Sequence, residues 1–87
     1  MKQKSSAPPL TVIARSPFHI YYEGTALVVS ANNKVGQFDV LPGHADFFSV
    51  MSPGDVVIET ESDIVNFAIV NGIIAVRDNE VMLFVNM

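Results

Sequence analysis

The sequence contains no cysteine and no tryptophan, and only 16% of its 87 residues are charged. Without cysteine the chain has neither a disulfide scaffold nor a cysteine-based zinc site. Nine Asp and Glu against five Lys and Arg give a net charge of −4, which leaves no basic patch for a nucleic-acid backbone. The low charged fraction and a mean hydropathy of +0.36 exclude intrinsic disorder. The sequence therefore predicts a folded domain that does not bind nucleic acid.

Long uninterrupted hydrophobic runs are also missing. The most apolar stretch, residues 64–76, is interrupted by Asn66, Asn71 and Gly72 and is shorter than the roughly 20 residues of a membrane-spanning helix. Near the start, the apolar run at residues 10–14 is shorter than the core of a signal peptide. The sequence predicts a soluble domain without a secretion signal.

Two segments of different composition divide the chain. Residues 1–9 contain two Lys, two Ser and two Pro and almost no aliphatic side chain. Because they cannot offset the entropy cost of ordering, they are expected to form a flexible tail. Residues 10–87 are rich in Val and Ile and are long enough for one domain, which a dense apolar core must stabilise.

The pattern of residues 10–87 predicts an all-β fold. β-branched side chains favour pleated sheets over helices, and turn signals recur at short intervals. Strands are expected at residues 10–15, 18–22, 25–31, 35–40, 46–51, 55–60, 64–70, 73–77 and 80–85. No segment predicts a helix. Short antiparallel strands at this spacing favour a two-sheet sandwich or a flattened barrel.

Several of these strands are apolar on both faces. In the last strand, Val81, Leu83 and Val85 alternate with Met82 and Phe84. A sheet with one face in water would have a polar residue at every second position. The additional apolar positions therefore need either a second layer or a protein partner.

Two dipeptides predict the turns near the end of the chain. Asn71-Gly72 has the composition of a type I′ turn, in which both central residues need φ > 0, and Asp78-Asn79 is expected to form the next turn. The last three strands would then form a meander.

The residues that catalysis needs are scarce. Nucleophilic catalysis requires a Ser, Thr or Cys beside an oriented His, and the chain has only His19 and His44. His19 lies in an alternating segment and is expected to face solvent or to be a satisfied core residue. His44 follows a Pro-Gly pair and is expected to bond to nearby backbone. The sequence therefore predicts no catalytic residue.

Metal and nucleotide sites are not predicted either. Two isolated His are too few for zinc. Glu59, Glu61 and Asp63 lack the ligand spacing of a calcium loop and are expected to form a solvated acidic turn. The glycines do not form a phosphate-binding motif. No cofactor is therefore expected, and a binding or assembly module is the remaining class.

Residues 35–54, with the sequence VGQFDVLPGHADFFSVMSPG, resemble the signature of the epsilon subunit of F-type ATP synthases, called delta in mitochondria. That signature is G-x-[LF]-x-[IV]-x-P-G-H-A, followed by an apolar strand and a second P-G. Residues 71–83 resemble the family's G-G-x-x-x-V…V-x-[VL] segment, with Asn71 in place of the first Gly. Residues 10–24 resemble its opening hairpin, which is one or two residues longer here. The resemblance covers residues 10–87.

The resemblance implies a flattened antiparallel β-sandwich of about ten short strands. It also implies a non-catalytic subunit of the central stalk, which joins the gamma subunit to the membrane rotor ring and couples proton flow to ATP synthesis. The complex would hold it peripherally on the cytoplasmic face of the bacterial plasma membrane. In that family an inhibitory helical hairpin follows the sandwich, and because this chain ends at Met87 it is expected to lack that element.

The resemblance also assigns roles to single residues. The family's loop before P-G-H offers a carboxylate to the rotor ring, and Gln37 stands at the matching position. Strand alternation places Asp39 on the same face, so Asp39 is a second candidate for the ring contact, with an ordinary solvent-exposed residue as the alternative. Pro42 and Gly43 are expected to form a tight turn beside His44, in a region that the resemblance places near gamma.

The sequence leaves two questions open: where Met82 and Phe84 are buried, and to which class of function the domain belongs. Met82 and Phe84 are candidates for burial against gamma, although burial in the domain's own core is the favoured interpretation of each residue taken by itself. The second question concerns the class of function, because a free-standing sandwich that binds carbohydrate or another small ligand is the other possibility. Such a module needs exposed aromatic rings for stacking, for which Tyr21 and Tyr22 are the obvious candidates.

Overall fold

The computed structural model describes residues 8–87, and most of the expected tail, residues 1–7, lies outside the described residues. Nine strands and no helix are present between residues 8 and 87, so no helix there is long and apolar enough to cross a membrane. The strands are β1 (Leu10–Ser16), β2 (His19–Ala26), β3 (Val28–Asn33), β4 (Gly36–Val40), β5 (Phe47–Met51), β6 (Gly54–Glu59), β7 (Ile64–Ile69), β8 (Asn71–Arg77) and β9 (Glu80–Asn86).

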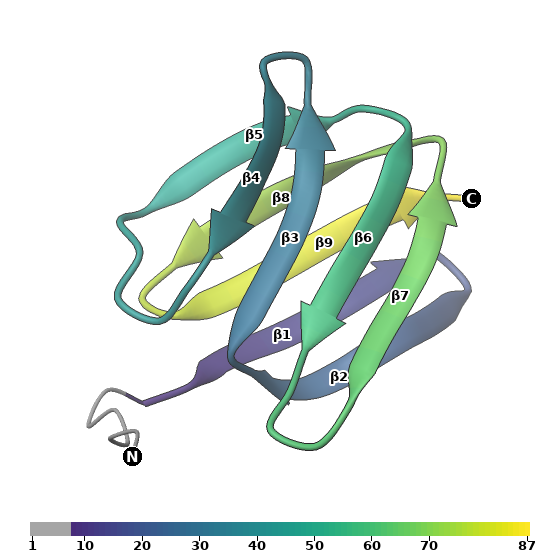
Figure 1. Ribbon diagram of the computed structural model, residues 1–87. Coiled ribbons are helices and arrows are strands. Elements are labelled where there is room, and N and C mark those ends of the chain that lie inside the picture. The colour runs from purple at the N-terminus through teal and green to yellow at the C-terminus, as the bar shows by residue number, and fades with distance from the viewer. Residues whose placement is uncertain (1–7) are drawn as a thin grey trace.

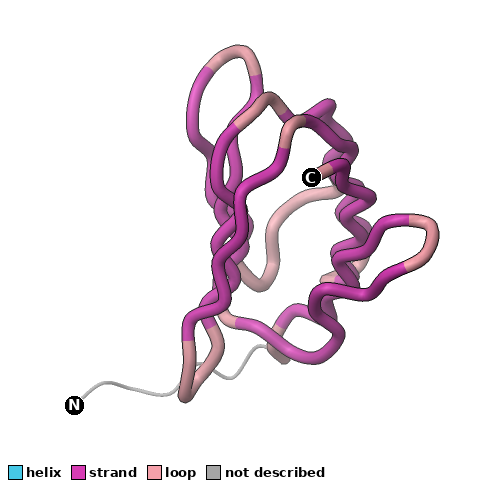
Figure 2. The backbone as a smooth tube through the Cα atoms, turned by 90° about the vertical axis from the view of Figure 1, so that its right-hand side faces the viewer, coloured by secondary structure: helices cyan, strands magenta, loops and turns pink. Residues whose placement is uncertain are grey.

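The strands form two sheets that face each other (Figure 1). The five-stranded sheet has the order β2-β1-β9-β8-β5, and the four-stranded sheet has the order β4-β3-β6-β7. Neighbouring strands are antiparallel, except that β1 runs parallel to β9. The side view separates the two layers (Figure 2). The predicted all-β sandwich is confirmed, with nine strands in place of about ten.

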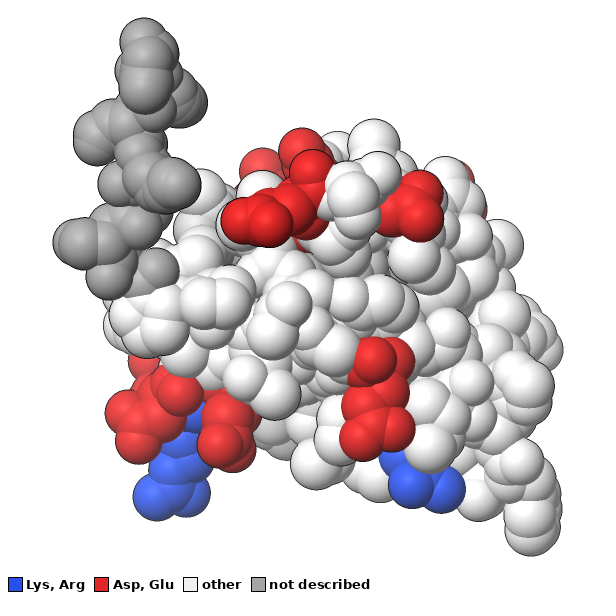
Figure 3. Space-filling model, turned by 90° about the horizontal axis from the view of Figure 1, so that it is seen from below, with Lys and Arg blue, Asp and Glu red and all other residues white. Residues whose placement is uncertain are grey.

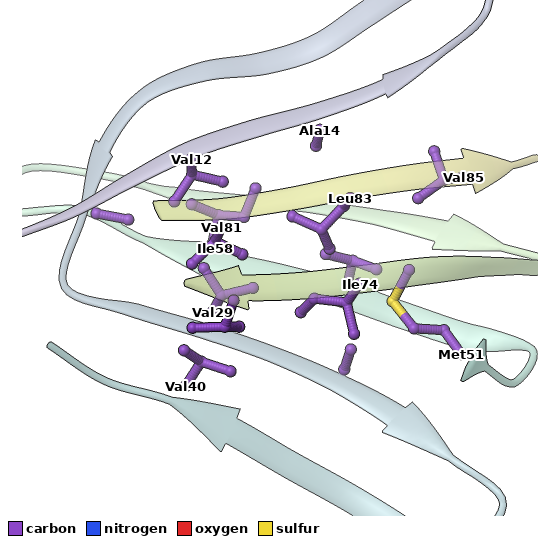
Figure 4. Packing of buried hydrophobic residues seen from close by; sticks show 14 of the residues in the cluster. Val12, Ala14, Val29, Val40, Met51, Ile58, Ile74, Val81, Leu83 and Val85 are labelled. Carbon is purple, nitrogen blue, oxygen red and sulfur yellow. The ribbon is translucent and has the colours of Figure 1, made fainter. Parts of the chain in front are cut away.

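The core lies between the sheets and follows from strand alternation, because every second side chain points inward. Figure 4 shows such side chains from both sheets meeting in one cluster. The buried residues are Leu10, Val12, Ala14, Ala26, Val29, Ala31, Val40, Met51, Val56, Ile58, Ile69, Ile74, Val76, Val81, Leu83 and Val85. All are apolar, and no polar side chain is buried in the described part of the chain. Hydrophobic burial therefore supplies the cohesion of the domain.

Aromatic pairs join the two sheets along both sides of the sandwich. Tyr21 of β2 packs against Phe67 of β7, with ring centroids 5.6 Å apart. On the other side, Phe38 of β4 contacts Phe47 of β5 edge-on, with centroids 5.2 Å apart. These four strands are the outermost strands of their sheets. Side chains thus close the sandwich on both sides.

The segment around Asn71 differs from the sequence prediction. β7 ends at Ile69 in the four-stranded sheet, and β8 begins at Asn71 in the five-stranded sheet. The predicted hairpin at Asn71-Gly72 and the three-strand meander are therefore wrong. The chain changes sheets here, and the N–H of Val70 donates to the carbonyl oxygen of Asn86 at 2.7 Å.

The turn predicted at Asp78-Asn79 is confirmed. Asp78 has φ 53° and Asn79 has φ 62°, the positive values that a type I′ turn requires at both central residues. This turn joins β8 to β9, which are antiparallel neighbours in one sheet.

The single strand predicted at residues 25–31 is wrong, because the chain changes from one sheet to the other within this segment. β2 continues to Ala26, and β3 begins two residues later in the other sheet. Leu27 lies between them, and its N–H donates to the carbonyl oxygen of Glu59 at 2.8 Å. Ala26 is buried as part of one sheet and Val29 as part of the other. This explains why the stretch is apolar without regular alternation.

Candidate interaction surfaces

The outer face of the five-stranded sheet is hydrophobic. Outward positions on its strands hold large apolar side chains, and Phe84 is 46% exposed and Phe48 67% exposed. We call this surface the apolar face, and it consists of Ile13, Ile20, Phe48, Val50, Ile73, Ala75, Met82 and Phe84. Large contiguous apolar patches on a folded domain are typical of surfaces that bind a protein partner.

Strand register joins these side chains into two continuous rows. One row runs across β1, β9, β8 and β5 through Ile13, Met82, Ala75 and Phe48. The next row crosses the same strands through Arg15, Phe84, Ile73 and Val50. Met82 and Phe84 therefore lie at the centre of an outer surface, and the interpretation favoured for each residue by itself, burial in the core, is wrong. The inward positions of β9 are occupied by Val81, Leu83 and Val85.

Two grooves follow these rows. One, with a volume of about 430 Å³, is lined by Pro17, Val50, Asn71, Gly72, Ile73, Phe84, Val85 and Asn86. The other, about 410 Å³, is lined by Thr11, Ile13, Ala75, Arg77, Glu80, Val81 and Met82. Both grooves are therefore lined in part by the exposed apolar side chains of the five-stranded sheet.

No sequence motif marks most of the residues of the apolar face. The signal is nevertheless present in the sequence, because strands that are apolar at both odd and even positions need cover on both sides. Register then decides which of those positions meet, and it brings Phe48 of β5 into one row with Ile13 of β1, which lies 35 positions earlier in the chain.

The outer face of the four-stranded sheet is more polar, and we call it the polar face. Its polar residues are Ser30, Gln37, Asp39, Asp55, Glu59 and Asn66, and Val28, Val57, Ile64 and Ala68 lie among them. Its four strands contain three carboxylates and no Lys or Arg. The two outer faces of the sandwich thus differ in both polarity and charge, so they suit partners of different chemistry.

Gln37 and Asp39 lie together on the polar face. Both are exposed, while Val40 is buried and Phe38 is half-buried, so β4 alternates as the sequence predicts. The Asp39 carboxylate accepts a hydrogen bond from the Ser30 hydroxyl at 2.7 Å and one from the Gln37 amide at 3.4 Å. These bonds orient the carboxylate and leave it open to solvent.

Pro42 and Gly43 form the predicted tight turn. The N–H of His44 donates to the carbonyl oxygen of Leu41 at 3.0 Å, and Gly43 has φ +85°, the left-handed conformation that glycine permits. The His44 imidazole Nδ1 lies 2.7 Å from the carbonyl oxygen of Ala45, which confirms its expected bond to nearby backbone.

Hydrogen bonds connect the Pro42-Gly43 turn and the residues after it to the turn between β8 and β9. The N–H of Gly43 donates to the side-chain oxygen of Asn79 at 2.9 Å, and the N–H of Asp78 donates to the Asp46 carboxylate at 3.3 Å. The turn therefore lies at one end of the five-stranded sheet, beside the strands that form the centre of the apolar face.

The residues that the resemblance assigns to two partners lie on opposite sides of the molecule. Gln37 and Asp39 are on the outer face of the four-stranded sheet, while Met82 and Phe84 are on the outer face of the five-stranded sheet. Because the core separates the two faces, both can be covered at the same time by different proteins.

The tyrosines do not form a stacking platform. Tyr21 and Tyr22 are both half-buried, and the Tyr21 ring packs against Phe67 across the two sheets. The Tyr22 hydroxyl donates to the carbonyl oxygen of Thr25. Ligand stacking needs free aromatic faces, so the structure does not favour the carbohydrate-binding alternative. His19 is exposed, and its ring lies 4.4 Å from that of Tyr21.

Acidic residues gather at the turn between β6 and β7. Glu59, Glu61 and Asp63 are exposed, and the Thr60 hydroxyl accepts hydrogen bonds from the N–H groups of Ser62 and Asp63. Seen from below, acidic side chains are more prominent than basic ones (Figure 3). In residues 8–87, no three His, Asp or Glu side chains are grouped as a metal site would require.

Residues 10–86 thus form a small β-sandwich with two dissimilar outer faces. Residues 9–87 match the family model described as the ATP synthase delta/epsilon chain, β-sandwich domain. The chain belongs to this family.

Curated relatives and solved structures agree with this assignment. The chain is 33% identical over 63 residues to an ATP synthase epsilon chain of Vesicomyosocius okutanii, covering 72% of this chain and 46% of that protein. It is 30% identical over 77 residues to the epsilon chain of Synechococcus elongatus, covering 88% and 56%. The chain thus spans about half the length of these relatives.

Two solved assemblies contain chains of the same fold. A chain of the Euglena gracilis mitochondrial ATP synthase, in a structure of OSCP, F1 and c-ring, matches with a TM-score of 0.85 at 17% identity, covering 98% of this chain and 56% of that one. A chain from the central stalk and c-ring of the Tetrahymena thermophila mitochondrial enzyme matches with a TM-score of 0.80 at 19% identity, covering 95% and 67%.

Proposed function

We propose that this chain is the β-sandwich part of an epsilon-type subunit in the central stalk of an F-type ATP synthase. There it joins the gamma subunit to the membrane rotor ring. The observation that supports this most strongly is the presence of two dissimilar surfaces on opposite sides of a domain of this family. A joint between two partners needs two separate surfaces. The similar Tetrahymena structure is described as a central stalk with its c-ring, which agrees with such a position.

The apolar face is the surface for gamma. Met82 and Phe84 lie at its centre, and burial of their exposed area supplies the driving force for association. Pro42, Gly43 and His44 form the turn at the end of the same sheet, so gamma reaches them where it extends past the β8–β9 turn.

The ring contact is made by the other sheet through Gln37 and Asp39. The Asp39 carboxylate is oriented by Ser30 and is exposed, so it is free to accept hydrogen bonds from basic or polar ring loops. The absence of Lys and Arg from these four strands keeps the surface suited to a cationic partner.

The domain itself transmits force and catalyses nothing. Two packed sheets resist bending, and the aromatic pairs that close both sides oppose sliding of one sheet over the other. Torque from the ring therefore reaches gamma through a stiff body, and proton flow is coupled to ATP synthesis. The chain is held at the cytoplasmic face of the bacterial plasma membrane through these partners.

Reconstitution tests this proposal. The purified chain is added to an epsilon-depleted complex of gamma and rotor ring from the same organism, and binding is measured together with ATP-driven proton pumping. We expect the chain to bind and to restore pumping. If a full-length homologue binds under the same conditions and this chain does not, the proposal is wrong.

Asp39→Asn is expected to weaken attachment to the rotor ring about two- to fivefold at low salt, the usual contribution of an exposed ion pair, and less at high salt. The amide keeps an oxygen that can accept the Ser30 hydrogen bond, so folding is preserved. Affinity for ring-containing complexes is measured at two ionic strengths. Asp55→Asn, on the same face, is the matched control. Equal affinity of Asp39→Asn and wild type at both ionic strengths would remove Asp39 from the interface.

A further inference from the structure

The tip of the β1–β2 hairpin exposes an aromatic side chain almost completely. Phe18 is 98% exposed, although a phenylalanine of this kind is among the side chains that gain most from burial. It lies between β1 and β2, directly after Pro17. The comparable position at the tip of the β3–β4 hairpin is Val35, which is 93% exposed.

The β1–β2 tip is braced by its own side chains. The Arg15 guanidinium donates to the carbonyl oxygens of Ser16, at 3.2 Å, and Pro17, at 3.3 Å. The Tyr21 hydroxyl donates to the Ser16 hydroxyl at 3.5 Å. Because these contacts hold the backbone of the tip, Phe18 is presented on a preorganised support, and less entropy is lost when a partner binds it.

A β-bulge lies at the base of this hairpin. Ala14 pairs with Tyr22, but the next residue, Arg15, pairs with Ile20, so Tyr21 is the additional residue on β2. A bulge bends and twists its strand. The β1–β2 turn forms the right-hand end of the molecule in Figure 1, and in Figure 2, seen from that end, a hairpin projects sideways beyond the layers.

The hairpin tip is continuous with the apolar face. Pro17 lines the same groove as Val50, Ile73 and Phe84. Ile20 of β2 is 46% exposed and pairs with Arg15, which pairs with Phe84. Ile20 therefore extends the row that contains Phe84. A partner that covers Phe84 therefore lies against the tip as well.

The charges near the tip favour a protein over a lipid surface. The cation nearest to the tip is Arg15, and its guanidinium is already bonded to two carbonyl oxygens of the tip. Across the outer side of the five-stranded sheet, Arg15 and Arg77 are balanced by Glu23 and Glu80. An anionic membrane would require an excess of free basic side chains, whereas a neutral apolar surface suits a protein interface.

We propose that Phe18 is an anchor residue for the partner that covers the apolar face. This inference rests on the proposed function, under which the partner is gamma, and it adds the hairpin tip to that interface. The Phe18 ring enters an apolar pocket of gamma while Pro17 and Phe84 form the adjoining wall. Aromatic side chains that fill a partner's pocket on a rigid support are typical binding hot spots.

The test compares Phe18→Ala with Val35→Ala in binding to the purified gamma subunit of the same organism's synthase. Both positions are exposed, so both variants are expected to unfold as the wild type does. We expect Phe18→Ala to weaken binding about 30-fold, as loss of a hot spot does, and Val35→Ala to leave the affinity within about twofold. Val35 lies on a hairpin of the other sheet, which makes it the matched control.

Further measurements distinguish failure of the Phe18 proposal from failure of the proposed function. If Phe84→Asp loses gamma but Phe18→Ala binds it as tightly as the wild type does, the anchor is refuted and the assignment of the apolar face to gamma stands. If the wild type itself does not bind gamma, both proposals fall. Sedimentation of the chain alone addresses a second copy as the occupant: a wild-type dimer that Phe18→Ala converts to monomer would overturn the anchor to gamma.

Discussion

Leu83→Ala is expected to lower the free energy of unfolding by about 2–5 kcal/mol, the range found for such truncations in close-packed cores. Leu83 is fully buried. It lies opposite Ile74 of β8 on one side and Ala14 of β1 on the other, in the middle of the five-stranded sheet, and it points toward the four-stranded sheet. Truncation removes these contacts and leaves a cavity that the surrounding strands cannot close without breaking their register.

This loss is large relative to the total free energy of unfolding of the domain. An 87-residue domain has a total stability of about 4–13 kcal/mol at the usual contribution per residue. Urea denaturation followed by circular dichroism measures the change. Leu83→Met, which conserves volume, is the control and is expected to cost less than about 1.5 kcal/mol. A cost below about 1 kcal/mol for Leu83→Ala would mean that Leu83 is not a core residue.

Phe84→Asp, one position further along β9, is expected to have the opposite effect. It should leave the free energy of unfolding almost unchanged and weaken binding to gamma. Phe84 points outward and is 46% exposed, so a carboxylate at this position remains hydrated in the free domain. The free energy of unfolding should change by no more than about 1 kcal/mol, the span of strand preferences. Binding to gamma should weaken by at least about 100-fold, because the interface would bury an unpaired charge.

The matched control introduces the same charge on the other side of the sandwich. Asn66→Asp places a carboxylate on the polar face, at an exposed position of β7. We expect this variant to bind gamma as the wild type does, since the proposed function assigns gamma to the opposite sheet. Titration calorimetry with the gamma subunit measures both variants. Tight binding by Phe84→Asp, or equal losses in the two variants, would contradict the assignment of the apolar face to gamma.

Leu83 and Phe84 show what adjacent positions of one strand contribute. Alternation makes one residue part of the core and the next part of the exposed apolar face, so adjacent positions of one strand serve different surfaces. The sequence predicts this alternation, but Leu and Phe are both hydrophobic, and composition alone does not say which of them faces inward. The structure decides because the four-stranded sheet covers only one side of β9.

Local chemistry was sufficient for the turns at Pro42-Gly43 and Asp78-Asn79. In both, the backbone conformation depends on the residues of the turn itself: proline restricts φ, and Gly, Asn and Asp tolerate positive φ. The same reasoning failed at Asn71-Gly72. There the dipeptide joins strands of different sheets, and a crossing between layers does not need the backbone geometry of a hairpin.

The sequence by itself determined that the chain is all-β, that its strands are short and several of them apolar on both faces, and that it resembles the epsilon family through residues 35–54. These properties depend on residue type and on neighbours within a few positions. Only the tertiary structure decided which strands share a sheet, which face of each strand is buried, and that Gln37 and Asp39 lie opposite Met82 and Phe84. The physical reason is that these outcomes require pairing between distant segments, such as β1 with β9, and alternation along one strand contains no information about its partner.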